Sequence, residues 1–206
     1  MTAAARRKLP MIFLASRSPR SKLLLAEAGL KFRTVPSAHE EVIHEGLSPE
    51  DNALWNALLK CSRAQIPAAV WGGPKRASVR AGRAVVLAAD TLIDFRGKVV
   101  VKPRDPADAE RILRSFSGRT HTVITAVALK DPSEDRYRTF TVKSRVTFKK
   151  LSLQQIRSYL DLGEYAGKAG AYGYQGRGRR LVLRVRGSET NVIGLPMERL
   201  KKLWRL

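Results

Sequence analysis

The feature that most constrains the fold is the segment AVVLAAD at residues 84–90, six apolar residues that end on a carboxylate. A short, continuous apolar run is typical of a buried strand. The strand is expected to end at Asp90, which places this carboxylate at the edge of the core, where an unpaired charge is costly. Residues 11–15 (MIFLA) form a second apolar run and lead directly into a polar turn. Both runs are typical of an α/β protein.

Helix-start signals follow these runs along the chain. Ser18-Pro19 pairs an N-cap residue with proline at the first helical position, and Gly29 is a suitable end. Ser48 is followed by Asp51 three residues later, which predicts a helix through about Ala64. Three further helices are predicted by Asp105-Pro106, by Ser152 with Gln155, and by Pro196.

The remaining predicted strands have patterns that favour antiparallel pairing, including alternation of apolar and polar residues. Residues 91–95 and 98–101 flank Arg96-Gly97 as a hairpin, and residues 121–129 and 138–148 resemble long, half-exposed strands. Another strand is expected at 181–187. Together these elements predict an α/β sandwich around a mixed sheet, with a cleft where the strand ends gather.

The chain length of 206 residues fits one well-cored domain. Residues 1–10 are interpreted as a flexible basic arm, and residues 11–206 as a single domain. Residues 66–83 contain two prolines and three glycines without periodicity, which predicts a long, variable surface loop.

Several classes of protein and site are excluded. No apolar run reaches the roughly 18 residues of a membrane span, and MIFLA is too short for a signal-peptide core. A single cysteine, Cys61, excludes an internal disulfide and a cysteine-built metal site. His39, His44 and His121 lack metal-type spacing. A cytoplasmic location without membrane contact is therefore expected.

The charge balance is strongly basic, with 39 Lys and Arg residues against 18 Asp and Glu residues and a formal net charge of +21. Such an excess attracts polyanions. The basic residues are scattered from Arg6 to Arg205, which argues against a dedicated nucleic-acid arm, and a general preference for arginine explains them as well. The cluster Arg177–Arg180 with Arg184 and Arg186 is equally consistent with an exposed strand face.

Phosphate binding is suggested by the turn Ser16-Arg17-Ser18-Pro19-Arg20. A helix N-terminus attracts anions through its free N–H groups, and a guanidinium can form two parallel hydrogen bonds to phosphate oxygens. The alternative is that Ser18 only caps the helix and the arginines are solvated.

Metal binding is suggested by carboxylates. Glu40 and Glu41 follow a strand expected near Phe32–Pro36, and Asp90 ends the strand expected at 84–90. Carboxylates at strand ends point into the ligand crevice of α/β folds, where Mg²⁺ or Mn²⁺ binds one or two of them together with substrate phosphates. The glutamates alone are also consistent with a solvated loop.

Charged and amide side chains complete the candidate set. Lys60 and Lys102 suit phosphate, although single lysines often only solubilise a surface. Residues 168–176 (KAGAYGYQG) carry three glycines and one amide, Gln175, which can read a nucleobase edge. A plain tight loop is the alternative.

Taken together, the chain resembles the Maf family of nucleotide pyrophosphatases. The resemblance rests on the ordered motifs LAS-x-SPR at 14–20, ADT at 89–91, KP at 102–103, SGRTH at 117–121, KAGAYGYQG at 168–176 and GLP at 194–196. It implies metal-dependent hydrolysis between the α and β phosphates of a non-adenine nucleoside triphosphate. It also implies an elongated fold like that of inosine-triphosphate pyrophosphatases, and a homodimer.

The resemblance also implies residue roles. Ser16 and Arg20 hold phosphate, while Lys60 and Lys102 neutralise it. Asp90 and Glu41 serve the metal and the attacking water. Apart from the resemblance, Asp90 is the candidate general base, with a role as metal ligand alone as the alternative. Gln175 contacts the base, and Thr91 resembles the branch that prefers dTTP and UTP.

One position departs from the family. Ser21 stands where a second arginine is usual, with Lys22 behind it. A serine cannot make a bidentate contact, so either Lys22 substitutes for it or phosphate affinity falls. Two other functions stay open: a purine enzyme acting on inosine or xanthosine triphosphate, and a basic protein without turnover that binds nucleic acid or regulates division.

Overall fold

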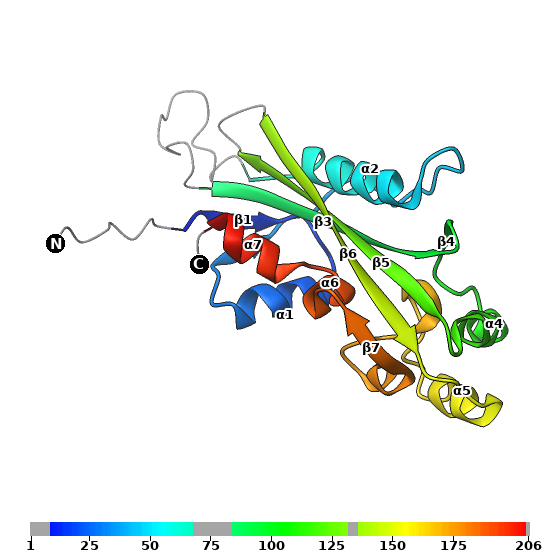
Figure 1. Cartoon of the computed structure of the whole chain (residues 1–206). Helices are drawn as coiled ribbons and strands as arrows, with labels where there is room; N and C mark the ends of the chain where they lie inside the picture. The colour runs from blue at the N-terminus through cyan, green and yellow to red at the C-terminus, as the bar shows by residue number, and fades with distance from the viewer. Residues whose placement is uncertain (1–8, 68–83, 132–135, 205–206) are drawn as a thin grey trace, which may run out of the picture.

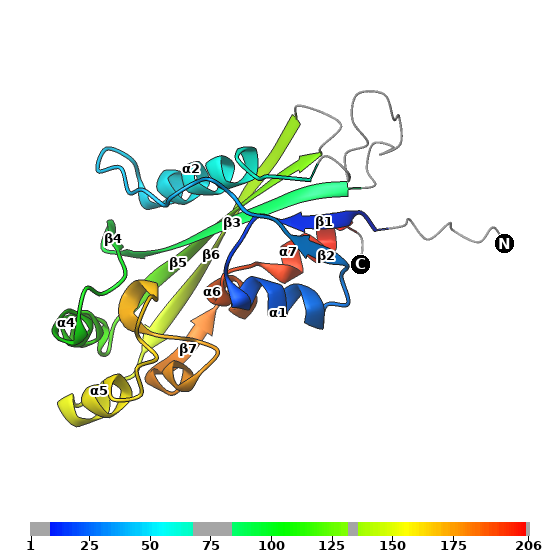
Figure 2. The same ribbon diagram turned by 180° about the vertical axis from the view of Figure 1, so that it is seen from behind.

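A mixed seven-stranded sheet forms the centre of the protein, and helices cover both of its faces (Figures 1 and 2). The computed structural model describes residues 9–67, 84–131 and 136–204. The strand order is β2-β1-β3-β5-β6-β7, with β4 paired to β3. This arrangement confirms the predicted α/β class and mixed sheet. The predicted arm at 1–10 and the loop at 66–83 lie almost entirely outside the described residues.

The sheet combines a parallel and an antiparallel part. In the parallel part, β1 (Met11–Leu14) lies between β2 (Phe32–Thr34) and β3 (Ala84–Phe95). The antiparallel part continues from β3 through three strands, and a short strand pairs with the end of β3. These strands are β5 (Thr120–Asp131), β6 (Arg136–Phe148), β7 (Val182–Arg186) and β4 (Lys98–Val100).

The prediction that a strand ends at Asp90 is wrong, because β3 continues to Phe95. Its parallel partner β1 stops at Leu14, which pairs with Leu87, whereas β5 pairs with β3 as far as Asp94. Asp90 therefore lies three residues beyond the end of the parallel pairing and in the middle of its own strand. The predicted hairpin is confirmed, with positive φ at Arg96 and Gly97 in the turn.

The predicted helices are confirmed with small shifts at their ends. They are α1 (Pro19–Glu27), α2 (Pro49–Ser62), α4 (Pro106–Phe116), α5 (Leu153–Leu160) and α7 (Met197–Trp204). Short 3-10 turns at 169–171 and 177–181, and the helix α6 (Glu189–Ile193), were not predicted. Within the described ranges, no helix has the length and apolar character needed to cross a membrane.

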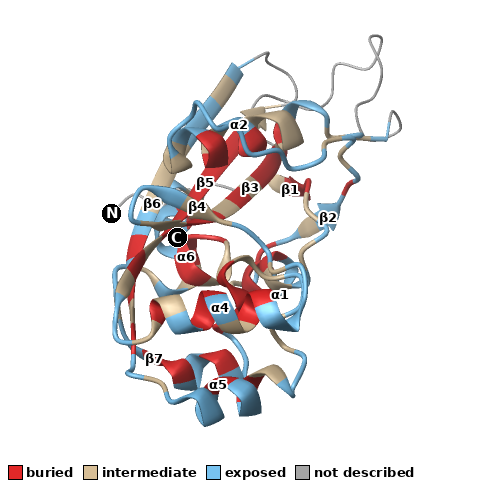
Figure 3. Cartoon of the chain, turned by 90° about the vertical axis from the view of Figure 1, so that its right-hand side faces the viewer, coloured by how far each residue is buried: buried red, intermediate tan, exposed pale blue. Residues whose placement is uncertain are grey.

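The two faces of the sheet bury alternate residues of the same strands, as the two-residue period of a strand requires. On one face, Phe13, Val86 and Ala126 pack against α2 through Ala53 and Ala57. The opposite face packs against α1 and α7 through the cluster of Ile12, Leu14, Leu24, Leu25, Leu87, Val127 and Leu200. Figure 3 shows the buried residues concentrated on these inner surfaces.

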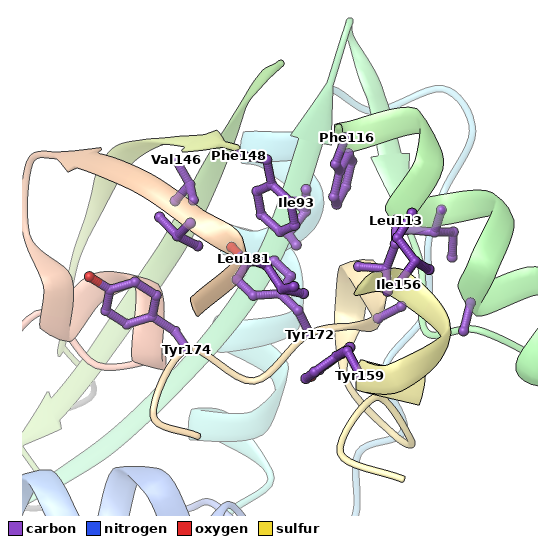
Figure 4. Close-up of a cluster of buried hydrophobic side chains, with 14 of the residues drawn as sticks. Ile93, Leu113, Phe116, Val146, Phe148, Ile156, Tyr159, Tyr172, Tyr174 and Leu181 are labelled. Carbon is purple, nitrogen blue, oxygen red and sulfur yellow. The ribbon is translucent and has the colours of Figure 1, made fainter. Parts of the chain in front are cut away.

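A third hydrophobic cluster fills the other end of the elongated molecule, between the sheet and α4 and α5 (Figure 4). Aromatic rings dominate it: Phe116 contacts Phe148 edge-on at 5.5 Å between ring centroids, and Phe148 contacts Tyr172 at 5.0 Å. Gly170 adopts φ +71°, and a Cβ there would collide with Ile93. The glycine is thus needed for the chain to pass over this cluster.

His121 belongs to this aromatic cluster, not to a metal site. Its ring stacks on Phe116 at 4.3 Å, and its Nε2 atom is 2.9 Å from the hydroxyl of Tyr172. Burial lowers the pKa of His121 to about 3. The folded protein therefore keeps this ring neutral, while the unfolded chain binds a proton below its ordinary pKa.

The free energy of unfolding should decrease as the pH is lowered, because of His121. A group whose pKa is depressed on folding stabilises the protein above its unfolded pKa, and this contribution is lost as the pH falls. Between about pH 7.5 and about pH 5, the wild type should lose about 2 kcal/mol more unfolding free energy than His121→Gln. Urea unfolding at both pH values measures the difference. Equal losses of unfolding free energy in both proteins would contradict the conclusion that His121 stays neutral in the folded protein.

Candidate functional site

A cleft of about 680 Å³ opens between the two ends of the molecule, beside the point where β1 stops and β3 continues. Its lining comes mainly from the turn at 15–21, the stretch around Glu41, the middle of β3, and the stretch from Gly167 to Tyr174. Lys60, Lys102, Val123 and residues 192–194 contribute as well. Of the predicted site residues, seven line this cleft: Ser16, Arg20, Glu41, Lys60, Asp90, Thr91 and Lys102. The structure thus brings together side chains that are far apart in the sequence.

The β1–α1 turn presents an open helix N-terminus to the cleft. The N-cap side chains of α2, α4, α5 and α6 each accept a hydrogen bond from a first-turn N–H group, whereas Ser18 makes no such bond. Instead, the Ser18 N–H donates to Ser16 Oγ at 3.1 Å. The first N–H groups of a helix lack intrahelical partners, so those of α1 remain available to an anion.

Arg20 adds a positive charge at the same place. Its side chain is half-buried and lines the cleft, and no carboxylate in the described part of the chain pairs with it. Burial lowers the pKa of the guanidinium from its ordinary value. A half-buried guanidinium without a counter-ion is suited to bind a phosphate group.

The opposite wall of the cleft holds a cluster of four charged side chains. The Lys60 ammonium lies 2.6 Å from Asp90 Oδ1 and 2.7 Å from Glu41 Oε1. Lys102 lies 3.1 Å from Glu41 Oε2. Lys60 comes from the last turn of α2, Asp90 from β3, and Lys102 from the chain after β4. Lys60 is therefore the bridge that joins the two carboxylates.

The two carboxylates differ in their environment. The Asp90 side chain is 3% exposed, and burial raises its pKa despite the attraction of Lys60. The Glu41 side chain is 46% exposed. Burial alone would raise its pKa, but Lys60 and Lys102 outweigh that effect and lower it to about 2. Asp90 thus accepts a proton far more readily than Glu41 does.

Lys60 stays protonated in this setting. Burial alone would lower its pKa, but the two carboxylates outweigh that effect and raise it. The cluster therefore keeps a permanent ammonium between Asp90 and Glu41.

One buried oxygen is left over. Asp90 Oδ2 has no hydrogen-bond partner in the described part of the chain. A free carboxylate oxygen is the ligand that a hard divalent cation prefers. The described residues contain no group of three acidic, histidine or cysteine side chains that could enclose a metal ion. The donors therefore fit an ion that completes its coordination with substrate phosphates and water.

Hydroxyl and amide groups form a chain behind the cleft. Thr91 Oγ1 lies 2.9 Å from Thr125 Oγ1, which in turn donates to the backbone carbonyl oxygen of Asn191 at 3.0 Å. The buried Asn191 amide donates to Val123 O and to Ser144 Oγ. This chain fixes the rotamer of Thr91, and it ties α6 to the sheet.

Gln175, by contrast, is exposed and is not among the residues that line the cleft. Its neighbours Tyr172 and Tyr174 do line it. The glycines around Gln175 make room for neighbouring side chains of the protein: a Cβ on Gly173 would crowd the Lys168 side chain, and one on Gly176 would collide with the Glu164 side chain. The tight-loop interpretation therefore explains these two glycines.

A known protein family matches nearly the whole chain. The family model described as Maf-like protein matches residues 11–205. The chain belongs to the Maf family.

Curated relatives cover nearly the whole chain. A protein of Bdellovibrio bacteriovorus named dTTP/UTP pyrophosphatase is 40% identical over 94% of this chain and 97% of its own length. Proteins with the same name from Moorella thermoacetica and Dictyoglomus turgidum are 40% and 36% identical, each over 93% of this chain. They are covered over 92% and 93% of their own lengths, respectively.

In this Maf chain, the structure shows where Ser21 lies, the residue that stands in place of the usual second arginine. Ser21 is buried in the first turn of α1 and lines the cleft. Lys22 is exposed and is not among the lining residues. Of the two alternatives raised by the sequence, the geometry therefore favours weaker phosphate binding over substitution by Lys22.

Three buried asparagines of this Maf chain support the site and were not predicted from the sequence. Asn52 and Asn56 lie on α2 and bond to the segment that carries Glu41, and Asn191 supports Thr91 through Thr125. A signal was present for the first two, because Asn52, Asn56 and Lys60 recur every four residues and so share one helix face.

Proposed function

We propose that this chain hydrolyses dTTP and UTP to the nucleoside monophosphate and pyrophosphate. The observation that carries the proposal is the Asp90–Lys60–Glu41 cluster in one cleft with an uncapped helix N-terminus and with Arg20, which has no carboxylate partner among the described residues. The names of the curated relatives support this substrate pair. Family resemblance also supports a homodimer in the cytoplasm.

Substrate binding follows from the charges. The first-turn N–H groups of α1 and the Arg20 guanidinium attract the triphosphate, and Ser16 offers a hydroxyl beside them. Lys102 is exposed, and Glu41 is the one hydrogen-bond partner of its ammonium among the described residues, so it can turn toward the phosphates. Positioning and charge neutralisation account for most of the catalysis in phosphoryl-group chemistry.

Asp90 acts as the general base in this proposal. A water oxygen attacks phosphorus, the bond to the pyrophosphate leaving group breaks, and a carboxylate oxygen of Asp90 takes the proton of the water. The raised pKa of Asp90 makes it a better proton acceptor than an exposed carboxylate. Lys60 holds the carboxylate in place through Oδ1 and leaves Oδ2 for the water or a cation.

Asp90 and Glu41 are also the residues that would hold Mg²⁺ or Mn²⁺. Such an ion, when bound, neutralises phosphate charge and lowers the pKa of a bound water molecule. Thr91 is proposed to contact the pyrimidine base or the sugar, since it lines the cleft beside Asp90. Gln175 is proposed to contact the base, which requires it to turn inward from its exposed position.

A product assay tests the proposed function. With Mg²⁺ or Mn²⁺, purified protein should convert dTTP and UTP to monophosphate and pyrophosphate, as identified by chromatography. Inosine and xanthosine triphosphates, included in the same panel, should react at least about tenfold more slowly in kcat/KM, a difference of about 1.4 kcal/mol.

The possible outcomes separate the alternatives. Orthophosphate and a diphosphate would mean that a different bond is cleaved. Faster turnover of inosine triphosphate would favour the purine enzyme. No turnover of any nucleotide would favour the basic binding protein, whose affinity for nucleic acid should fall steeply with salt.

The charges of the cluster predict how tightly the site binds a divalent metal ion without nucleotide. Two carboxylates and two ammonium groups cancel, so a free divalent cation gains little there without substrate phosphates. Mn²⁺ alone should bind with a dissociation constant above about 1 mM, and Lys60→Met should bind it at least about tenfold more tightly. Calorimetric titration of the metal without nucleotide measures both values.

The exposed Lys98 offers a matched control, because Lys98→Met removes the same charge outside the cleft. Its Mn²⁺ affinity should equal that of the wild type. Tight Mn²⁺ binding by the wild type without nucleotide would refute the neutral-cluster argument.

A further inference from the structure

Three polar side chains form a stripe along α2. Asn52, Asn56 and Lys60 are four residues apart, so they lie on the same helix face, one turn after another. Both asparagine side chains are fully buried. Figure 2 shows the segment that covers them, residues 38–47, which runs back alongside α2 before that helix begins. This segment carries Glu41.

Asn56 bonds directly to the peptide that follows Glu41. Its side-chain oxygen accepts the Val42 N–H at 3.1 Å, and its side-chain nitrogen donates to the Val42 carbonyl oxygen at 2.9 Å. The amide thereby pairs with both backbone groups of one residue, as a neighbouring strand would. His39 Nε2 lies 2.9 Å from the same Asn56 oxygen.

Asn52 repeats this arrangement one turn earlier on the helix. Its oxygen accepts the His44 N–H at 2.7 Å, and its nitrogen lies 3.0 Å from the His44 carbonyl oxygen. The same nitrogen lies 3.1 Å from the Leu47 carbonyl oxygen. Residues 42 and 44 are thus matched to successive turns of α2, and Glu41 comes next to Lys60, the following member of the stripe.

Burial of apolar side chains does not hold this segment. Val42, Ile43 and Leu47 are exposed, so they contribute little hydrophobic stabilisation. The segment forms neither helix nor strand over residues 38–44. The asparagine amides are accordingly the main buried contacts that fix its position on α2.

We propose that Asn52 and Asn56 are positioning residues that set the place of Glu41 in the charged cluster, with Asn56 as the more important. The inference deepens the proposed function and rests on it, because Glu41 is assigned to the metal and the attacking water. Asn56 acts through Glu41 and touches neither substrate nor metal.

A double-mutant cycle tests this inference. Asn56→Ala should lower kcat/KM for UTP by at least about tenfold and raise the Mg²⁺ concentration for half-maximal rate, because Glu41 is no longer held beside Lys60. In a Glu41→Gln background, the same Asn56→Ala change should cost less than about twofold. A loss of equal size in both backgrounds would overturn the positioning role.

Asn191→Ala is the matched control. Asn191 is equally buried and also bonds through its side-chain nitrogen, to Val123 O and Ser144 Oγ, yet none of its hydrogen bonds reaches residues 38–47. Its effect on kcat/KM should be the same in the wild-type and Glu41→Gln backgrounds. Coupling to Glu41 as strong as that of Asn56 would mean that the cycle reports general destabilisation, which overturns the inference.

Hydrogen exchange followed by mass spectrometry supplies a readout that needs no turnover. Asn56→Ala should speed exchange in peptides covering residues 39–46 by at least about tenfold and leave β5 unchanged. If Asn56→Ala does not fold, Asn52→Ala tests the same segment through His44. Unchanged exchange over 39–46 would overturn the positioning role even if the wild type hydrolyses UTP. An inactive wild type with the expected exchange would instead refute only the proposed function.

Discussion

The ion pair between Lys60 and Asp90 is the interaction on which the site depends. A carboxylate on a central strand of the sheet is costly to bury unless a partner compensates its charge. The ammonium of Lys60 supplies that partner at 2.6 Å, and it reaches Asp90 only because α2 lies close to the sheet. The helix can approach because its inner face carries the small residues Ala53, Ala57 and Cys61. The packing of α2 on the sheet and the geometry of the charged cluster are thus coupled through one helix.

The sheet topology decides where this ion pair meets the N-terminus of α1. β1 ends at Leu14 beside Leu87, and the turn after β1 opens over the stretch of β3 that has lost its parallel neighbour. Asp90 and Thr91 occupy that stretch, so the N-terminus of α1 and the charged cluster face the same cleft. The remainder of β3 continues with β5 into the aromatic cluster at the other end, which closes the cleft from that side.

Local signals in the sequence predicted most of the elements. Ser48, Asp105 and Ser152 accept the predicted N-cap hydrogen bonds, and Ser152 with Gln155 forms a complete capping box. The prediction that a strand ends at Asp90 was wrong, because the length of β3 depends on long-range pairing with β5, which no local sequence pattern reveals. The asparagine anchors were missed because a buried amide on a helix is recognisable only once its backbone partners are known.

The sequence identified the candidate residues better than it identified the contacts between them. Seven of the eight line one cleft, but the sequence did not indicate that Lys60 bridges the two carboxylates. That contact joins residues 30 positions apart, Lys60 and Asp90, and it depends on the register of α2 over β3. Gln175 lies in a loop whose side-chain orientations are set by packing. Its exposed position could therefore not be predicted from the glycine pattern.

The most direct test of the central claim is the activity and ligand binding of Asp90→Asn, measured together. Asparagine keeps the shape of the side chain, and Lys60 keeps Glu41 as a partner, so the variant should fold and should still bind UTP with Mg²⁺ in a calorimetric titration. The account predicts that UTP hydrolysis falls by at least about a thousandfold, about 4 kcal/mol, because the carboxylate proposed to take the proton of the water is removed. A folded, UTP-binding Asp90→Asn variant that hydrolyses UTP at a rate near that of the wild type would contradict the account.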